Sequence, residues 1–332
     1  MNLAAIKRPS ANVVTLLATI AVFVLLYGIA AARYHDRNFF TLPVFIDFFR
    51  DNAYLGVAAV GMTFVILSGG IDLSVGGVVG LTGILLATMI EQKNMHPGVA
   101  MPIVLAIGTL LGTLMGFMIH YFQLAPFFVT LAGMFLARGL ALVISSESIG
   151  LDPPLFLWLT EHAVIPLGGR NRIPFVAIVF VAVAAIGIFV ARCTPFGRNT
   201  YAIGGNEPSA VLMGLPVGRT KVGVYALSGF CSALAGVVWS LSLWSGNANA
   251  GSLMELDAIA AVVLGGTLLS GGVGSVFGTV FGVLILAIIQ TSLNFEGTLS
   301  SWWTKIAIGM LLLAFITMQR LLTKLGAVRA SP

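Results

Sequence analysis

Charged side chains are scarce in this chain. Only 9% of the 332 residues are Asp, Glu, Lys or Arg, whereas soluble domains carry about 25%. Hydrophobic residues make up 58% of the chain, and the mean hydropathy is +1.02. This composition excludes an ordinary soluble domain and predicts an integral membrane protein. Because the apolar runs are continuous rather than alternating, we expect an all-α polytopic protein rather than a β-barrel.

Residues that usually carry chemistry are also few. The two cysteines, Cys193 and Cys231, and the four histidines have no metal-ligand spacing. The sequence has no Gly-x-x-x-x-Gly-Lys-Ser/Thr loop for nucleotide phosphates and no recognisable catalytic set. The basic residues behind the net charge of +5 are dispersed at the ends of apolar runs, which argues against a nucleic-acid partner. We therefore expect this chain to bind no metal or cofactor and not to hydrolyse ATP.

What the sequence does have is a series of long apolar runs. A helix needs about 20 residues to cross a hydrocarbon core of about 30 Å. This criterion predicts about ten transmembrane helices in a single domain, 1–332, at approximately 13–32, 52–69, 73–91, 99–121, 127–146, 173–192, 222–244, 257–270, 273–292 and 302–321. The eighth span is short, so we expect it to be broken or tilted. An even number of spans puts both termini on one side, and the positive-inside rule predicts that this side is the cytoplasm.

The stretch 192–221 is the longest polar interruption with a basic excess. It contains one acid, Glu207, and four basic residues: Arg192, Arg198, Arg219 and Lys221. A loop with this bias is typical of the cytoplasmic side, so 193–221 is predicted to be a cytoplasmic loop. Two interpretations remain open, an ordinary connector and a docking element for a soluble partner.

A short helix is predicted inside this loop. Asn206 is a good N-cap, Pro208 is tolerated in the first turn, and Glu207 favours the positive end of the helix dipole. Gly214 then stops the helix. We expect it to span about 207–213 and to offer apolar contacts from Ala210, Val211 and Met213. Such a helix is too short to cross a bilayer, but it can lie in a groove of a soluble partner.

Glycines form two further patterns. Two stretches carry glycine at every fourth position, which lets helix backbones pack closely: Gly108, Gly112 and Gly116, and Gly274, Gly278 and Gly282. In addition, LSGGIDLSVG at 67–76 resembles LSGGVGSVFG at 269–278. The second pattern indicates either a duplicated unit or chance similarity.

Three ionisable residues lie within or at the edge of predicted spans. A charge in the bilayer interior costs at least about 2.5–3.5 kcal/mol, so such residues usually face a cavity or a partner. Asp72 is interpreted either as the N-cap of the third span or as a polar group on a solute path. Arg138 is either a structural hydrogen-bond donor or a substrate contact, and Lys305 is close enough to the outer surface to snorkel.

Two stretches resemble a known family. GMTFVILSGGIDLSVG at 61–76 and FGRNTYAIGGNEPSA at 196–210 are similar to the permease subunits of bacterial ABC importers for monosaccharides, of the ribose and galactofuranose type. The resemblance covers nearly the whole chain, and a galactofuranose permease is the most similar type. Pro208 and Ser209 stand where many members have two alanines, which makes the start of the short helix a point of departure.

The resemblance implies an importer-permease fold in the bacterial inner membrane. It implies a separate ABC ATPase subunit that uses the ATP, a second permease, identical or paralogous, and a periplasmic sugar-binding protein. The residues expected to couple to the ATPase are Arg198, Asn206, Glu207, Pro208, Ala210, Met213 and Gly214. Those expected on the translocation path are Ser68, Asp72, Ser74 and Arg138.

Other functions remain open at this point. Branched-chain amino acids or nucleosides are the alternative substrates within the same class. An ion-coupled secondary carrier would need a chain of buried acids, which the sequence lacks. An intramembrane enzyme would need a catalytic set.

Overall fold

The structure is a computed structural model that describes residues 11–152, 154–167, 172–297 and 302–328. Helices dominate it. The first half contains α1 (Ala11–Arg33), η1 (His35–Arg37), α2 (Leu42–Asp51), α3 (Ala53–Leu67), α4 (Val75–Ala87), η2 (Thr88–Gln92), α5 (Pro97–Tyr121), α6 (Pro126–Ile144) and α7 (Pro154–His162). The second half contains α8 (Phe175–Cys193), α9 (Pro195–Gly205), α10 (Glu207–Leu212), α11 (Val217–Leu243), α12 (Met254–Leu264), α13 (Val276–Glu296) and α14 (Trp302–Val328).

Four two-residue strands form two small antiparallel pairs. β1 (Ile149–Gly150) pairs with β4 (Ser245–Gly246), and β2 (Ile165–Pro166) pairs with β3 (Arg172–Ile173). They close connections between helices and carry none of the core.

Seven of the described helices are long and apolar enough to cross a membrane, which agrees with a polytopic membrane protein. The remaining predicted spans fall on α3, α12 and α14. The predicted boundary between the eighth and ninth spans is wrong by several residues. The interruption is not two residues long but runs from 265 to 275, because four glycines there adopt positive φ and keep the chain out of a helix: Gly266, Gly271, Gly272 and Gly274.

The core is built around α3, α4 and α11. Almost every residue of α3 and α4 is buried, and α11 packs against α3, α4 and α5. The predicted glycine pattern on α5 is confirmed: a Cβ at Gly112 would collide with the carbonyl oxygen of Tyr225 on α11, and Gly108 and Gly116 lie equally close to that helix. On α13, Gly278 and Gly282 contact α12 in the same way, whereas Gly274 lies before the helix begins.

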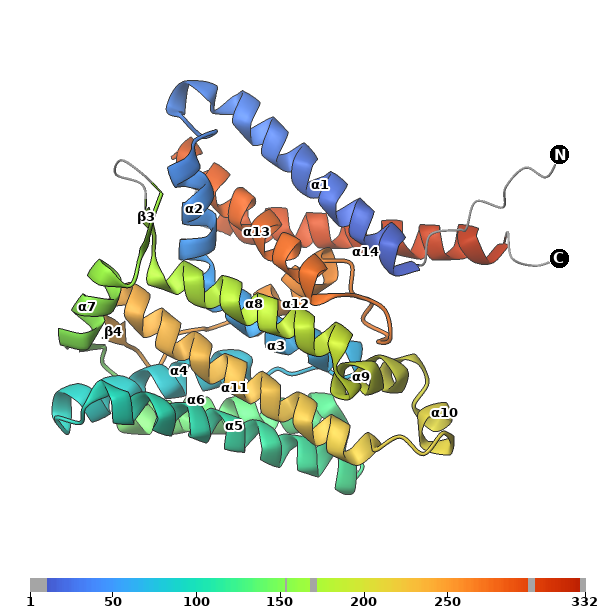
Figure 1. The fold of residues 1–332 in the computed structure, drawn as a ribbon, viewed down its shortest axis with the longest axis horizontal. Coiled ribbons are helices and arrows are strands. Elements are labelled where there is room, and N and C mark those ends of the chain that lie inside the picture. Colours follow the sequence, from blue (N-terminus) through green and yellow to red (C-terminus); the bar gives the residue numbers. More distant parts are fainter. Residues whose placement is uncertain (1–10, 153, 168–171, 298–301, 329–332) are drawn as a thin grey trace.

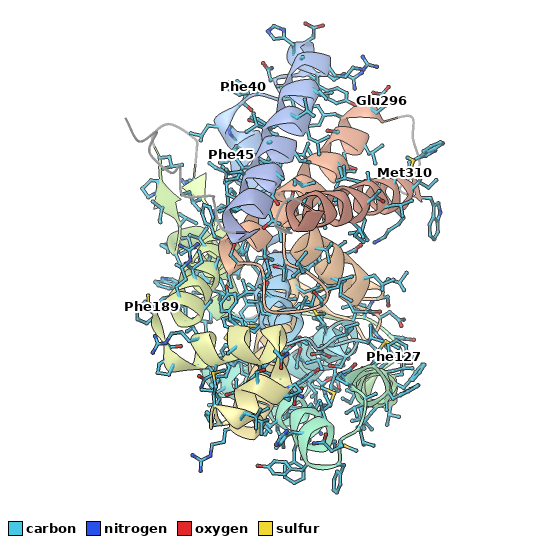
Figure 2. All side chains as sticks on the ribbon, turned by 90° about the vertical axis from the view of Figure 1, so that its right-hand side faces the viewer. Phe40, Phe45, Phe127, Phe189, Glu296 and Met310 are labelled. Atoms are coloured by element: carbon cyan, nitrogen blue, oxygen red, sulfur yellow. The ribbon has the colours of Figure 1, made fainter. Side chains whose placement is uncertain are left out.

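Large apolar side chains cover the outside of the bundle. Figure 2 shows Phe127 on α6 and Phe189 on α8 pointing away from the helices, and Met310 on α14 does the same. Exposed apolar patches of this extent are unfavourable in water, but they match a hydrocarbon environment.

The two ends of the bundle differ. In Figure 1, α9 and α10 lie at the right-hand end, which we call the α10 end, and α1 begins and α14 ends on this same side. The opposite end, called the α7 end, carries α2, α7 and the β2–β3 pair (Figure 1). The termini of the described bundle and the basic loop therefore share one side.

Two connections between consecutive helices lie at the α10 end, and we call them the first and the second break. α3 and α4 are separated by 68–74, and α12 and α13 by 265–275, so that each copy of the LSGG sequence forms a break. Gly69 and Gly271, which occupy the same place in the two copies, both have positive φ. The second break is bonded to the end of α3, directly before the first break, because the amide of Gly272 donates to the carbonyl oxygen of Leu67 at 2.9 Å.

Candidate functional site

The short helix α10 is capped as the sequence predicts. The side-chain oxygen of Asn206 accepts a hydrogen bond from the amide of Ser209 at 2.8 Å, and Pro208 lies in the first turn. Met213 is the C-cap, so the helix ends one residue earlier than expected. Gly214 follows with φ of +73° and turns the chain away. The result is a rigid protrusion between two longer helices.

The faces of α10 differ from the prediction in one respect. Ala210 is fully buried against Ile203 and Val217 of the chain itself, so the expected outward contact of Ala210 is corrected. The apolar surface that α10 presents lies at its C-terminal end, where Leu212 is 88% and Met213 67% exposed. The six-residue helix buries one side chain, Ala210, and leaves its last turn exposed.

One of the charged side chains of α10 forms an ion pair within the chain. The Nζ of Lys221 on α11 lies 2.6 Å from Oε1 of Glu207 and forms an ion pair with it. Glu207 therefore fixes α10 to α11 rather than being free for another subunit. The exposed basic side chains Arg198 and Arg219 remain on the surface of this end.

Helix α9 touches both breaks, which the sequence did not indicate. A Cβ at Gly204 would collide with the carbonyl oxygen of Leu67, the last residue of α3 before the first break, and with the amide nitrogen of Gly272 in the second break. The hydroxyl of Tyr201 donates to the carbonyl oxygen of Gly274 at 3.0 Å. Burial raises the pKa of the Tyr201 hydroxyl, with Arg192 acting in the opposite direction, so the donor proton is held. The signal in the sequence was the Gly-Gly pair directly before the N-cap of α10.

Asp72 lies in the first break and is fully buried. Its Oδ1 accepts hydrogen bonds from the amide of Ser74 at 2.9 Å and from the hydroxyl of Ser74 at 2.6 Å. Its Oδ2 accepts from the hydroxyl of Ser228 on α11 at 2.6 Å. The N-cap of α4 is Ser74 rather than Asp72, so the predicted capping role is corrected: Asp72 orders the turn before the helix and joins it to α11.

The other expected path residues are also engaged inside the chain. Ser68 donates to the carbonyl oxygen of Val65 at 2.7 Å and is nearly buried. Arg138 on α6 donates to the carbonyl oxygens of Ala248, of Ala250 at 2.8 Å and of Gly76 at 3.0 Å. It thereby fastens the segment between β4 and α12 to α4. A role of these residues on a translocation path stays a prediction.

Lys305 does not simply snorkel. Its Nζ lies 2.7 Å from both carboxylate oxygens of Asp257, which joins α14 to α12 at the α7 end. Within the described ranges, no group of three or more His, Cys, Asp or Glu residues is placed to hold a metal ion.

The fold and this site define a class: a polytopic helical membrane protein with a capped helix protruding from one end, preceded by a helix, α9, that packs against the two breaks. The chain belongs to the family described as branched-chain amino acid transport system, permease component, whose model matches residues 44–316. It is a membrane permease component.

Individual relatives cover nearly the whole chain. It is 50% identical over 317 residues to the inner membrane ABC transporter permease protein YjfF of Escherichia coli strain K12, and the matched region covers 95% of each chain. It is 36% identical to the fructose import permease of Bifidobacterium longum (93% of this chain, 92% of the relative) and 42% identical to the ribose import permease of Bacillus subtilis (83% and 84%). No solved structure matches the chain.

Proposed function

We propose that this chain is the membrane-spanning subunit of a binding-protein-dependent ABC importer for a monosaccharide in the bacterial inner membrane. The family description mentions branched-chain amino acids, but the import permeases compared with it act on ribose, fructose and xylose. These sugar permeases argue against the amino-acid and nucleoside alternatives. The particular sugar is left to experiment.

We further propose ten spans, with both termini and α10 in the cytoplasm. Seven long apolar helices, together with α3, α12 and α14, supply this number. The shared side of the α1 start, the α14 end and α10 supports the orientation, and so does the basic excess of 193–221 (Figure 1).

The observation that carries the proposal is the last turn of α10. Leu212 and Met213 are large, apolar and exposed on a helix whose base is held by a cap, an ion pair and a buried alanine. Apolar side chains on a rigid protrusion suit a groove of a soluble partner. The partner proposed is an ATPase subunit that uses ATP, with a second permease and a periplasmic sugar-binding protein completing the importer. This chain itself would bind no nucleotide.

Leu212→Asp tests this proposal. The change places a charge in the apolar contact but disturbs nothing inside the chain, because Leu212 is almost fully exposed. In proteoliposomes with the cognate ATPase and binding protein, we expect the parent to take up one of ribose, fructose, xylose or galactose in an ATP-dependent way. Leu212→Asp should lower uptake and the stimulation of ATP hydrolysis by the binding protein roughly tenfold or more.

The matched control is Gln123→Asp. Gln123 is exposed in the connection between α5 and α6, at the same end of the molecule but outside α10, and its left-handed backbone tolerates Asp. This control should keep parental uptake. Uptake that needs no ATP would indicate a secondary carrier, and uptake of leucine in preference to every sugar would contradict the proposed substrate class.

A further inference from the structure

A cavity of about 350 Å³ lies at the α7 end, far from the α10 contacts. Its wall combines the start of α3, the end of α11, the segment before α12, and parts of α12, α13 and α14. This volume falls within the range of about 300–1,000 Å³ that small-molecule sites occupy. The cavity is formed where several helices meet, which is a common place for such sites.

An aromatic pair forms one side of this cavity. Tyr54 and Trp239 have ring centroids 4.4 Å apart at an interplanar angle of 67°. Both side chains line the cavity and both are only partly buried. Rings of this kind offer an apolar face next to a polar tip. A pyranose or furanose, which has apolar C–H faces and hydroxyls at its edges, matches that combination.

The other side of the cavity is polar. Asn249, Asp257, Gln290 and Lys305 line it. In the part of the chain that the structure describes, the side-chain amides of Asn249 and Gln290 have no hydrogen-bond partner, so each can donate and accept toward a ligand. The ion pair of Asp257 with Lys305 adds carboxylate acceptors and ammonium donors that are half-exposed. Hydroxyl groups of a sugar need this mixture of donors and acceptors.

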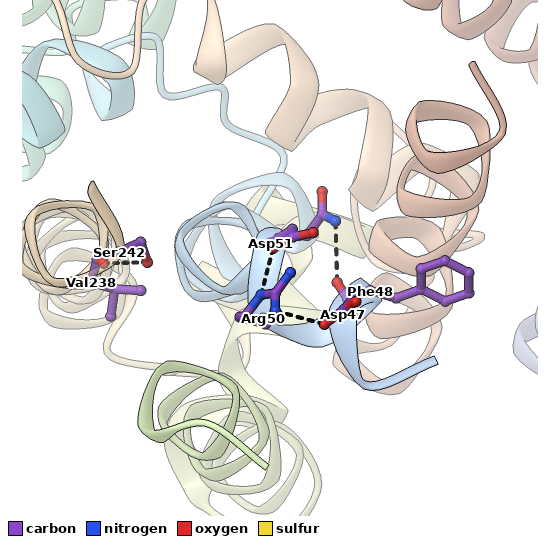
Figure 3. Close-up of polar contacts among 7 residues, drawn as sticks. Asp47, Phe48, Arg50, Asp51, Val238 and Ser242 are labelled. Carbon is purple, nitrogen blue, oxygen red and sulfur yellow. Dashed lines mark hydrogen bonds and ion pairs between the residues drawn. The ribbon is translucent and has the colours of Figure 1, made fainter. Parts of the chain in front are cut away.

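A second cavity, of about 380 Å³, lies on the other side of the same aromatic pair and makes a useful contrast. Its polar lining includes Arg50, Asp51 and Ser242. Figure 3 shows these groups already paired: Arg50 binds Asp47 and Asp51, and the hydroxyl of Ser242 donates to the carbonyl oxygen of Val238 at 2.8 Å. Of these two cavities, only the first combines an aromatic wall with amides that have no partner among the described residues.

We propose that the cavity bounded by Tyr54, Trp239, Asn249, Asp257, Gln290 and Lys305 is a monosaccharide-binding site of the permease itself. The inference rests on the proposed function and adds to it a place where the sugar is held after it leaves the binding protein. The aromatic pair contacts a C–H face of the sugar, and the amides and the ion pair bind its hydroxyls. Recognition of the sugar is then shared between the binding protein and this chain.

The double variant Asn249→Ala with Gln290→Ala tests the site without threatening the fold, because both side chains are exposed and have no partner among the described residues. The importer is reconstituted with its ATPase and binding protein, and the probe is whichever of radiolabelled ribose, fructose, xylose or galactose the parent transports best. We expect uptake at limiting sugar-loaded binding protein to fall about tenfold, since two hydrogen bonds are lost. Stimulation of ATP hydrolysis by the binding protein should stay at the parental level, because α10 is untouched.

Gln92→Ala is the matched control, since Gln92 is an exposed amide at the same end that does not line the cavity. It should transport like the parent. Parental uptake in the double variant would overturn the site, and so would an equal loss of uptake and of ATPase stimulation, which would indicate a structural defect. If the parent transports none of the four sugars, the proposed function fails before the site is tested, so the two failures are distinguishable.

Discussion

The two breaks share the LSGG sequence but are held in different ways. The first break is joined to α11 by the buried carboxylate of Asp72, which accepts from Ser228. The second contains no charged residue and is joined to α9 by the hydroxyl of Tyr201. Since α9 precedes α10 and α11 follows it, these two side-chain hydrogen bonds link the breaks to opposite sides of the protruding helix. We expect a movement of α10 to reach both breaks through these bonds, in addition to the contacts of Gly204 on α9 with Leu67 and Gly272.

This comparison also explains why Asp72 is tolerated in an apolar chain. A buried carboxylate is costly unless its oxygens are hydrogen-bonded. Both oxygens of Asp72 are engaged, and all three donors come from serine residues close by in the fold. This hydrogen-bond network accounts for a buried carboxylate at position 72. The first variants to make are therefore those that remove its hydrogen bonds.

The largest effect is expected from Asp72→Leu. Three buried donors, the amide and hydroxyl of Ser74 and the hydroxyl of Ser228, would lose their acceptor. An unsatisfied buried group costs about 1–3 kcal/mol, so the change should destabilise the protein by several kcal/mol and prevent assembly. The thermal stability of the purified protein in detergent is the measurement.

Asp72→Asn is the companion variant. The carboxamide keeps one acceptor and can donate to Ser228, so assembly should survive with a smaller loss of stability. If uptake persists in this variant, the role of Asp72 is structural and confined to the hydrogen-bond network. Loss of uptake with normal assembly and normal stability would instead favour a role on the translocation path.

A smaller effect is expected at Gly204, where both breaks meet α9. Gly204→Ala places a methyl group against the backbone of Leu67 and of Gly272, and overpacking of this kind costs about 1–3 kcal/mol. Gly205→Ala is the same change one residue later, where no atom lies within 4 Å of the new Cβ. We expect a lower melting temperature for the first variant only. Equal melting temperatures would mean that α9 does not clamp the breaks.

The smallest effect on stability is expected from Tyr201→Phe. It removes the single hydrogen bond to the carbonyl oxygen of Gly274, which should cost about 0.5–1.5 kcal/mol. Tyr121→Phe removes a hydroxyl from an exposed tyrosine elsewhere and should cost nothing. If Tyr201 transmits movement, its variant should also lower the stimulated ATPase activity more than its stability predicts. ATPase activity in proteoliposomes, compared with the melting temperature, separates the two contributions.

Local signals predicted much of this arrangement. Hydropathy located the seven long apolar helices, and the Asn206 cap and Gly214 located α10, because both signals depend on residues adjacent in the chain. Contacts between distant segments were not predictable: Ser228 lies 156 positions from Asp72, and the approach of Gly204 to both breaks depends on backbone placement. The orientation of Ala210 was missed for a related reason. A six-residue helix has too few residues to show from its sequence which face is buried.

Because Ala210 is buried, it is not the residue at which to test a contact between α10 and a partner. Ala210→Asp would place a charge in the buried contact with Ile203 and Val217 and would damage the chain itself. Leu212→Asp leaves that contact intact and tests the surface alone.

Hydrogen exchange in the assembled importer tests the central claim, that α10 controls both breaks through separate hydrogen bonds. Exchange is compared between the nucleotide-free and ATP-bound states for peptides covering 68–74 and 265–275. In the parent, the protection of both segments should change together when ATP binds. In Tyr201→Phe, the change in 265–275 should be reduced more than that in 68–74, because only the second break loses its side-chain hydrogen bond to α9. If ATP binding leaves both segments unchanged in the parent, or if Tyr201→Phe leaves both changes intact, the breaks are not driven from α10.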